Sequence, residues 1–245
     1  MDKKHFAIAL ALALTVATLL TACGSAPRTQ AAQESHAKDA LAQKYHTEFE
    51  IVQMYPQKLG DKYYEVQAYP AGDPSTLFTA AIDTDDDNCS SNYIERKVCS
   101  AIAASVEDAL VGLPGDSYAF VCGVGPQPLT DDTDISVDEY IALDDMNKFR
   151  VELFAVLDDE TSDMLYQSLS DALGNRAGMT AAMNLYAIDA EQMKAVREYF
   201  SKNDGLYFDY KLLTADYPQA ELSYENGQLV TEESKFSAWM SLLES

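Results

Sequence analysis

The chain has 245 residues, of which 40 are acidic and 17 are basic, so its formal net charge is −23. A surface this acidic repels phosphate groups, and nucleic-acid binding is therefore not expected. Hydrophobic residues make up 47% of the sequence, which is enough for a folded core despite the high charge. The acidity is compatible with solubility at an anionic cell surface, with cation capture or with a basic protein partner.

Residues 1–22 have the composition of a secretory signal peptide. Asp2, Lys3 and Lys4 form a short charged region, and an uncharged apolar run follows over residues 6–20. Small residues then precede a cleavage point, as they do in signal peptides. The apolar run is shorter than the roughly 20 residues that a membrane-spanning helix needs, so we do not predict a transmembrane segment here.

The last residues of this region and the next one, Leu20-Thr21-Ala22-Cys23, resemble the lipobox of bacterial lipoproteins. The resemblance implies cleavage before Cys23 and attachment of diacylglycerol to its sulfur. It also implies a lipid-anchored protein at a cell membrane, facing outside the cytoplasm. Two or more acyl chains hold a protein stably, because each buried methylene contributes about 0.8 kcal/mol. Residues 23–39 carry few large apolar groups, and we interpret them as a lipidated tether.

The remaining chain is predicted to have an α+β fold (mixed α/β) made of two lobes. Residues 40–127 form the first lobe, an antiparallel sheet with one helix in the order β-β-β-α-β. Alternation at Tyr64, Val66 and Ala68 supports one of its strands, with these three side chains on one face. The predicted strands are 49–54, 63–69, 77–82 and 118–124, and the predicted helix is 92–110, capped by Ser90 or Ser91.

A polar connector over residues 128–148, with a short helical or irregular segment at 137–143, leads to the second lobe. Residues 149–245 form this lobe, which is expected to have the order β-α-β-α-β followed by a C-terminal hairpin and helix. The predicted strands are 149–157, 181–188 and 206–213, and the predicted helices are 161–173, 189–201 (capped by Asp189) and 234–243. Asn226-Gly227 is predicted to form the hairpin turn.

The acidic stretch between residues 83 and 95 allows two interpretations. Asp83, Asp85 and Asp87 occupy the first, third and fifth ligand positions of an EF-hand loop, which would make a weak calcium site. However, Ile94 stands where that loop needs a bidentate glutamate, and Glu95 comes one residue late. The alternative is an acidic turn whose carboxylates stabilise the beginning of the helix at 92–110. We predict no other cofactor.

Besides Cys23, the chain contains Cys89, Cys99 and Cys122, so at least one of these three is unpaired within the chain. The rise per residue of a helix and of a strand places Cys99 and Cys122 at similar heights, so a disulfide between them is geometrically allowed. Buried free thiols are the alternative, because free cysteine is often buried.

The sequence contains no G-x-S-x-G, H-E-x-x-H, G-x-x-x-x-G-K or C-x-x-C motif. His46 is the one histidine expected in the folded part, so a zinc site or a catalytic triad is not predicted. We therefore expect a non-catalytic surface module that binds a protein or an envelope component. One alternative is the solute-binding lipoprotein of a transporter, with a deep pocket between lobes. The other is an envelope hydrolase, with paired carboxylates of perturbed pKa in one cleft.

Overall fold

The computed structural model describes residues 29–57, 60–113, 115–144, 148–157, 162–173, 176–202 and 219–243. The predicted signal peptide, Cys23 and the predicted strand 206–213 lie outside these residues. The chain divides into two units, Met1–His36 and Ala37–Ser245. Helix α2 (Gln30–Tyr45) begins in the first unit and ends in the second. The interpretation of residues 23–39 as a tether is therefore wrong from Gln30 on, because this alanine-rich segment is helical and Ala37 is buried in the core. No helix in the described part of the chain is both long and apolar enough to cross a membrane.

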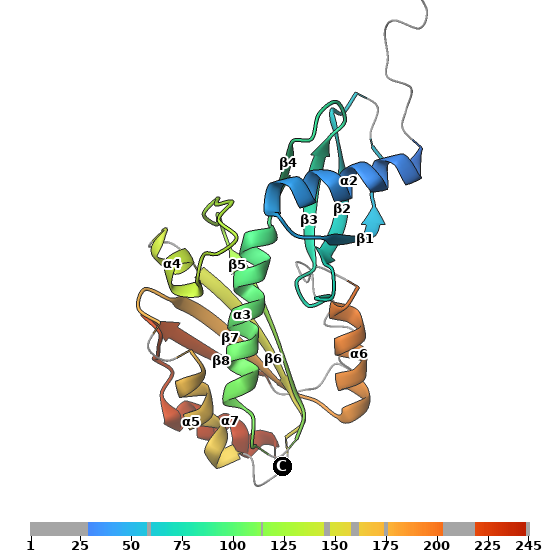
Figure 1. Cartoon of the computed structure of the whole chain (residues 1–245). Helices are drawn as coiled ribbons and strands as arrows, with labels where there is room; N and C mark the ends of the chain where they lie inside the picture. Colours follow the sequence, from blue (N-terminus) through green and yellow to red (C-terminus); the bar gives the residue numbers. More distant parts are fainter. Residues whose placement is uncertain are drawn as a thin grey trace, which may run out of the picture. The chain divides into compact units, whose positions relative to one another are not determined.

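The first sheet of the unit Ala37–Ser245 has four antiparallel strands in the order β1-β2-β3-β4 (Figure 1). They are β1 (Phe49–Met54), β2 (Tyr63–Pro70), β3 (Phe78–Asp83) and β4 (Cys89–Ser91). Along β2, Tyr64, Val66 and Ala68 are buried, as their alternation predicted, whereas the intervening Glu65 is exposed. The buried side chains share a core with Leu41 of α2, so the opposite side of the sheet carries Glu65.

The second sheet has five strands in the order β5-β6-β7-β8-β9. They are β5 (Ser117–Val124), β6 (Lys148–Ala155), β7 (Thr180–Ala187), β8 (Gln219–Glu225) and β9 (Gln228–Leu229). Strands β6 and β7 are parallel, and helix α5 (Ser162–Ala172) lies in the crossover between them. The other neighbouring strands of this sheet are antiparallel.

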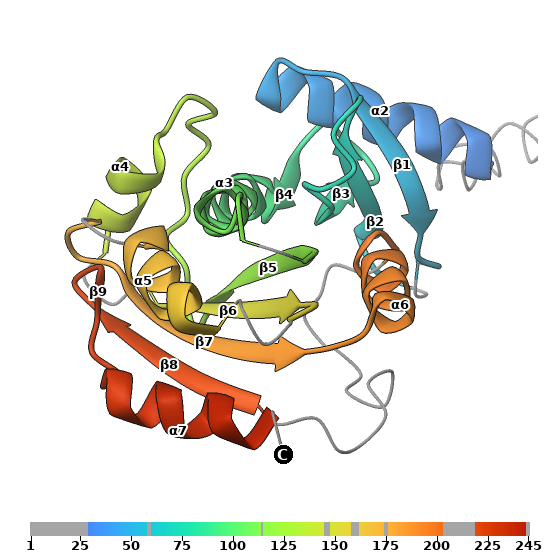
Figure 2. The ribbon, with the colours of Figure 1, turned by 90° about the horizontal axis from the view of Figure 1, so that it is seen from below.

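Alternate side chains of the second sheet belong to two different cores. The remaining described helices are α3 (Tyr93–Ala109), α4 (Val137–Ala142), α6 (Ala190–Phe200) and α7 (Glu233–Leu243). Helices α3 and α5 lie side by side and share the main core with one set of strand residues (Figure 2). Helix α6 packs in a second core with Phe120, Phe154 and Tyr186, which alternate with the first set.

The predicted α+β class is confirmed, and the sheets are mostly antiparallel. Several local predictions are also confirmed. The segment 137–143 contains the short helix α4. Asp189 caps α6 by accepting a hydrogen bond from the Gln192 amide. Asn226 and Gly227 form the turn between β8 and β9 with positive φ angles of 50° and 71°.

The boundary between the two sheets differs from the predicted boundary between the lobes. The sequence assigned the strand at 118–124 to the first lobe, whereas β5 pairs along its whole length with β6, from Ser117 opposite Ala155 to Val124 opposite Lys148. The connector at 128–148 therefore joins two adjacent strands of one sheet. The alternation within β5 is compatible with either sheet, and strand pairing over this distance leaves no local trace in the sequence.

The free edge of β5 is covered by side chains of α3. The backbone amide of Ala119 donates to a Glu107 carboxylate oxygen at 2.8 Å, and the carbonyl oxygen of Val121 accepts from Arg96 at 2.6 Å. Both groups point away from β6, because their hydrogen bonds go to side chains of α3. These two backbone groups of the edge are therefore satisfied within the chain.

Candidate ligand-binding pocket

The acidic stretch forms a β-hairpin turn, and the prediction that it leads directly into a helix is wrong. Asp83 ends β3, and its backbone amide donates to the carbonyl oxygen of Asn88 just before β4. The Asp83 carboxylate accepts from the amide of Asp85, as aspartates do in tight turns. Within the described ranges, no three side chains of His, Cys, Asp or Glu converge in a way that could hold a metal ion, and Asp83, Asp85 and Asp87 are included in that finding.

Cys89, Cys99 and Cys122 are free thiols, so the disulfide between Cys99 and Cys122 is not formed. The physical reason is strand alternation. Cys99 of α3 and Val121 of β5 belong to the main core, whereas Cys122 points to the other face of the sheet and packs with the α6 core. Burial raises the pKa of Cys99 to about 12 and also raises the pKa of Cys122.

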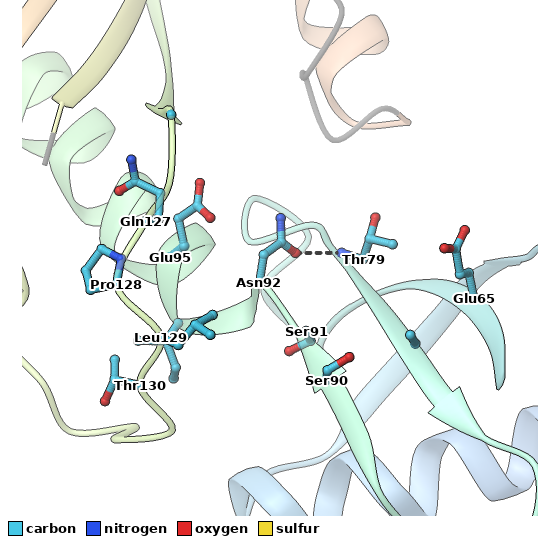
Figure 3. Close-up of a pocket in the computed structure, with 13 residues that line it drawn as sticks. Glu65, Thr79, Ser90, Ser91, Asn92, Glu95, Gln127, Pro128, Leu129 and Thr130 are labelled. Atoms are coloured by element: carbon cyan, nitrogen blue, oxygen red, sulfur yellow. Dashed lines mark hydrogen bonds between the residues drawn. The ribbon is translucent and has the colours of Figure 1, made fainter. Parts of the chain in front are cut away.

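A pocket of about 430 Å³ lies between the outward face of the first sheet and the segment that follows β5 (Figure 3). It is beside the first turn of α3, which connects the two parts. Four separate regions of the chain line it, and its residues are Glu65, Thr79, Ala81, Ser90, Ser91, Asn92, Ile94, Glu95, Gly125, Gln127, Pro128, Leu129 and Thr130.

Asn92 fixes the beginning of α3 to the sheet. It occupies the N-cap position, but its side chain makes no capping bond to the helix. Instead, its Oδ1 accepts a hydrogen bond from the Thr79 backbone amide at 2.9 Å (Figure 3). The Asn92 backbone amide donates to the Thr79 carbonyl oxygen at 3.3 Å. The predicted N-cap residue, Ser90 or Ser91, is wrong, because both serines belong to β4. The Ser91 hydroxyl nevertheless accepts from the Tyr93 amide, the first of α3, at 3.2 Å. The sheet wall and the helix wall of the pocket are thus held together.

Glu95 lies in the first turn of α3 and is half-buried. Burial raises the pKa of its carboxyl, whereas the positive charge of Arg96 and a hydrogen bond from the Gly123 amide lower it, and burial has the larger effect. The favourable interactions of the carboxylate therefore do not fully offset the cost of removing it from water. Figure 3 shows it beside Gln127 and across the pocket from Glu65.

Gln127 packs directly over the backbone of Gly123. A β-carbon at Gly123 would lie 2.4 Å from the Gln127 Cδ, so the close approach depends on glycine. The Nε2 of Gln127 donates to the carbonyl oxygens of Val124 and Lys148 at 3.3 and 3.4 Å. Its Oε1 is buried and has no hydrogen-bond partner among the described residues, which is unusual for a buried acceptor.

The pocket lining is acidic and partly apolar. Its 13 residues include the carboxylates Glu65 and Glu95, four hydroxyl side chains and no lysine, arginine or histidine. Ala81, Ile94, Pro128 and Leu129 provide its apolar part. The sequence analysis singled out neither Glu65 nor Gln127 and considered Glu95 only as a displaced calcium ligand. No sequence pattern joins these residues, because they come from β2, α3 and the segment after β5.

A second polar cluster, on the second sheet, consists of side chains that pair with one another. The side chain of Glu152 is fully buried, and one of its carboxylate oxygens lies 2.9 Å from the Arg150 Nε. The other oxygen accepts from the Tyr186 hydroxyl at 2.8 Å and from the Asn184 amide at 3.1 Å. A buried carboxylate with three such partners is typical of a structural ion pair.

Comparisons with known proteins identify the fold alone. No family model matches the sequence, and no curated protein matches it either. The structure is similar to the crystal structure of a DUF5037 family protein from Ruminococcus gnavus, with a TM-score of 0.61 and 16% sequence identity. The match covers 85% of this chain and 99% of that chain.

Proposed function

We propose that this protein is a lipid-anchored lipoprotein that faces outside the cytoplasm and binds a ligand without chemical conversion. The observation that carries the anchoring is the sequence Leu20-Thr21-Ala22-Cys23 directly after an uncharged apolar run. A signal of this kind places the folded part on a tether, because the acyl chains on Cys23 stay in the bilayer. The net charge of −23 disfavours nucleic-acid binding and is compatible with a location at the cell surface.

The binding role is supported by the pocket beside α3. It has the volume of an ordinary small-molecule site, and it combines apolar walls with a few polar groups. The solute-binding alternative gains support from the same pocket, because its walls come from the first sheet and from the end of a strand of the second. The hydrolase alternative gains less, because Glu65 is exposed and does not form a buried pair of carboxylates with Glu95.

Metabolic labelling with an alkyne fatty acid in a bacterial host tests the anchoring. We expect label in the mature chain of the membrane fraction, complete loss of label in Cys23→Ala, and full labelling in the matched variant Cys89→Ala. Cys89 is the suitable control because it is the partly exposed thiol among the cysteines of the described part of the chain. An unlabelled wild-type chain, or an uncut product in the cytosol, would overturn the proposal.

A further inference from the structure

We infer that the pocket beside α3 binds an aliphatic polyamine-type cation, with two ammonium groups joined by a methylene chain. The inference rests on the proposed binding role and specifies the chemistry of the ligand. Lysine side chains of a basic partner would present the same groups, so the free amine and the protein-borne amine are the two sources to distinguish.

The two charged side chains that line the pocket, Glu65 and Glu95, are hydrogen-bond acceptors. Four hydroxyl side chains in the lining can accept hydrogen bonds as well. An ammonium group carries three donors and no acceptor, so it pairs directly with carboxylate and hydroxyl oxygens. An anionic ligand is disfavoured, because the 13 lining residues include no cation.

The positions of the carboxylates favour two charges on the ligand. Glu65 projects from β2 and Glu95 from α3, and Figure 3 shows them on opposite sides of the pocket. A ligand with an ammonium group at each end offers one charge to each carboxylate. Because Asn92 ties the helix to the sheet through Thr79, the backbone positions from which the two glutamates project are held in place before binding.

The apolar part of the lining suits a methylene chain. Ala81 and Ile94 contribute to the lining, and Leu129, another lining residue, is 97% exposed. A leucine side chain so fully exposed gains by covering apolar surface, and an aliphatic chain in the pocket supplies such surface. The volume of about 430 Å³ exceeds what a single ammonium or a metal ion would need.

Isothermal titration calorimetry on the full chain in a non-ionic detergent tests this inference. The ligands are putrescine and spermidine, a peptide with two neighbouring lysines, butylamine with one ammonium group, and neutral butanediol. Salt at about 0.15 M suppresses non-specific attraction to the acidic surface. We expect putrescine or the lysine peptide to bind about tenfold more tightly than butylamine, and butanediol not to bind.

Pocket variants with a matched control locate the site. Glu65→Gln and Glu95→Gln should each weaken binding about tenfold, because each removes one charge contact. Glu48→Gln removes the same charge from an exposed position outside the pocket and should leave the affinity unchanged within about twofold. The melting temperature of each variant shows whether its fold is intact.

The outcomes separate the inference from the proposed function. Binding of free amines supports a small-molecule ligand, and binding of the lysine peptide alone supports a basic protein partner. Amine binding that all variants retain equally is attraction to the surface and overturns the inference. Absence of amine binding overturns it too, as does pocket-dependent binding of butanediol as tight as that of putrescine, and the second result leaves the binding role standing. Loss of labelling at Cys23 would concern only the anchor.

Discussion

The Nη1 of Arg96 donates a hydrogen bond of 2.6 Å to the carbonyl oxygen of Val121. The Nε of the same side chain donates to the carbonyl oxygen of Leu77 at 3.2 Å, and its guanidinium lies 4.7 Å from the ring centroid of Phe120. Leu77 directly precedes β3 of the first sheet, and Val121 belongs to β5 of the second. One arginine, only 5% exposed, thus joins the two sheets on which the pocket depends.

Replacing Arg96 should therefore destabilise the whole unit. Arg96→Met removes both donors, and each buried carbonyl left without a partner costs about 1–3 kcal/mol. We expect the free energy of unfolding to fall by roughly 2–5 kcal/mol in urea denaturation. Arg96→Lys should have an intermediate effect, because one ammonium group cannot reproduce the fork of the guanidinium.

The matched control for this prediction is Lys194→Met on the exposed side of α6. It makes a comparable change in charge and should alter the free energy of unfolding by no more than about 0.5 kcal/mol. A loss in Arg96→Met no larger than in this control would mean that the link between Leu77 and Val121 does not contribute to stability.

The carboxyl group of Glu107 should make stability depend on pH. Burial raises its pKa, and the hydrogen bond from Ala119 and the charge of Arg197 only partly offset this effect. A raised folded-state pKa contributes stability that is fully present below the unfolded pKa and is lost as the pH rises through the folded pKa. Glu107→Gln keeps an acceptor for the Ala119 amide, but glutamine does not ionise, so the variant does not lose this stability as the pH rises. The variant should therefore gain stability relative to wild type between about pH 4 and pH 7.

Urea denaturation at several pH values measures this difference, and Glu198→Gln is its control. The hydrogen bond with Lys202 lowers the pKa of exposed Glu198, so its contribution to stability is present above the unfolded pKa and is lost as the pH falls. Glu198→Gln should thus show the opposite trend with pH. The same trend in both variants would contradict our account of Glu107.

The three thiols of the described part of the chain should react in an order set by burial. Cys89 is half-buried, Cys122 is 4% exposed and Cys99 is fully buried with a pKa raised to about 12. Alkylation of the folded chain at about pH 8 should modify Cys89 first and Cys99 last, because the thiolate is the reactive form. In denaturant, the thiol count should be the same with and without reductant. A smaller count without reductant would indicate a disulfide.

Short-range patterns of the sequence predicted most of the elements of the fold. Alternation identified β2, helical spacing identified α3, and Asn226-Gly227 identified the last hairpin. The pairing of β5 with β6 was missed, because strand pairing depends on residues far apart in the sequence. The strand β4, only three residues long, was also missed. The acidic stretch was therefore interpreted as the start of a helix, whereas it forms a hairpin turn.

The pocket was less predictable than the fold. Glu65 was recognisable as an outward-facing residue of β2, but nothing in the sequence indicated that it would face Glu95 and Gln127. These residues share a pocket because Asn92 holds α3 to the first sheet and Arg96 joins the first sheet to β5. An acidic sequence contains many carboxylates, and the tertiary contacts decide which of them share a pocket.

The hairpin turn between β3 and β4 should not respond to calcium. The carboxylate of Asp83 accepts from the Asp85 amide at 2.9 Å, and that of Asp86 accepts from the Asn88 amide at 2.8 Å. These bonds stabilise the turn without a cation. We expect no increase in melting temperature with calcium at about 1–5 mM, a range that saturates weak sites. An increase that Asp85→Asn abolishes, and that magnesium does not reproduce, would restore the calcium interpretation.

Gly123 and Gln127 should behave as one packing unit. Gly123→Ala places a methyl group 2.4 Å from the Gln127 Cδ, so the amide must move away from Val124 and Lys148. Gly123→Ala and Gln127→Ala should each lower the free energy of unfolding by about 1 kcal/mol. The double variant should lose clearly less than the sum, because the smaller side chain at position 127 leaves room for the methyl group. Combining Gly123→Ala with Leu129→Ala, at a fully exposed neighbour, should be additive within about 0.5 kcal/mol. Additivity of both pairs would show that the contact between Gly123 and Gln127 does not shape this wall of the pocket.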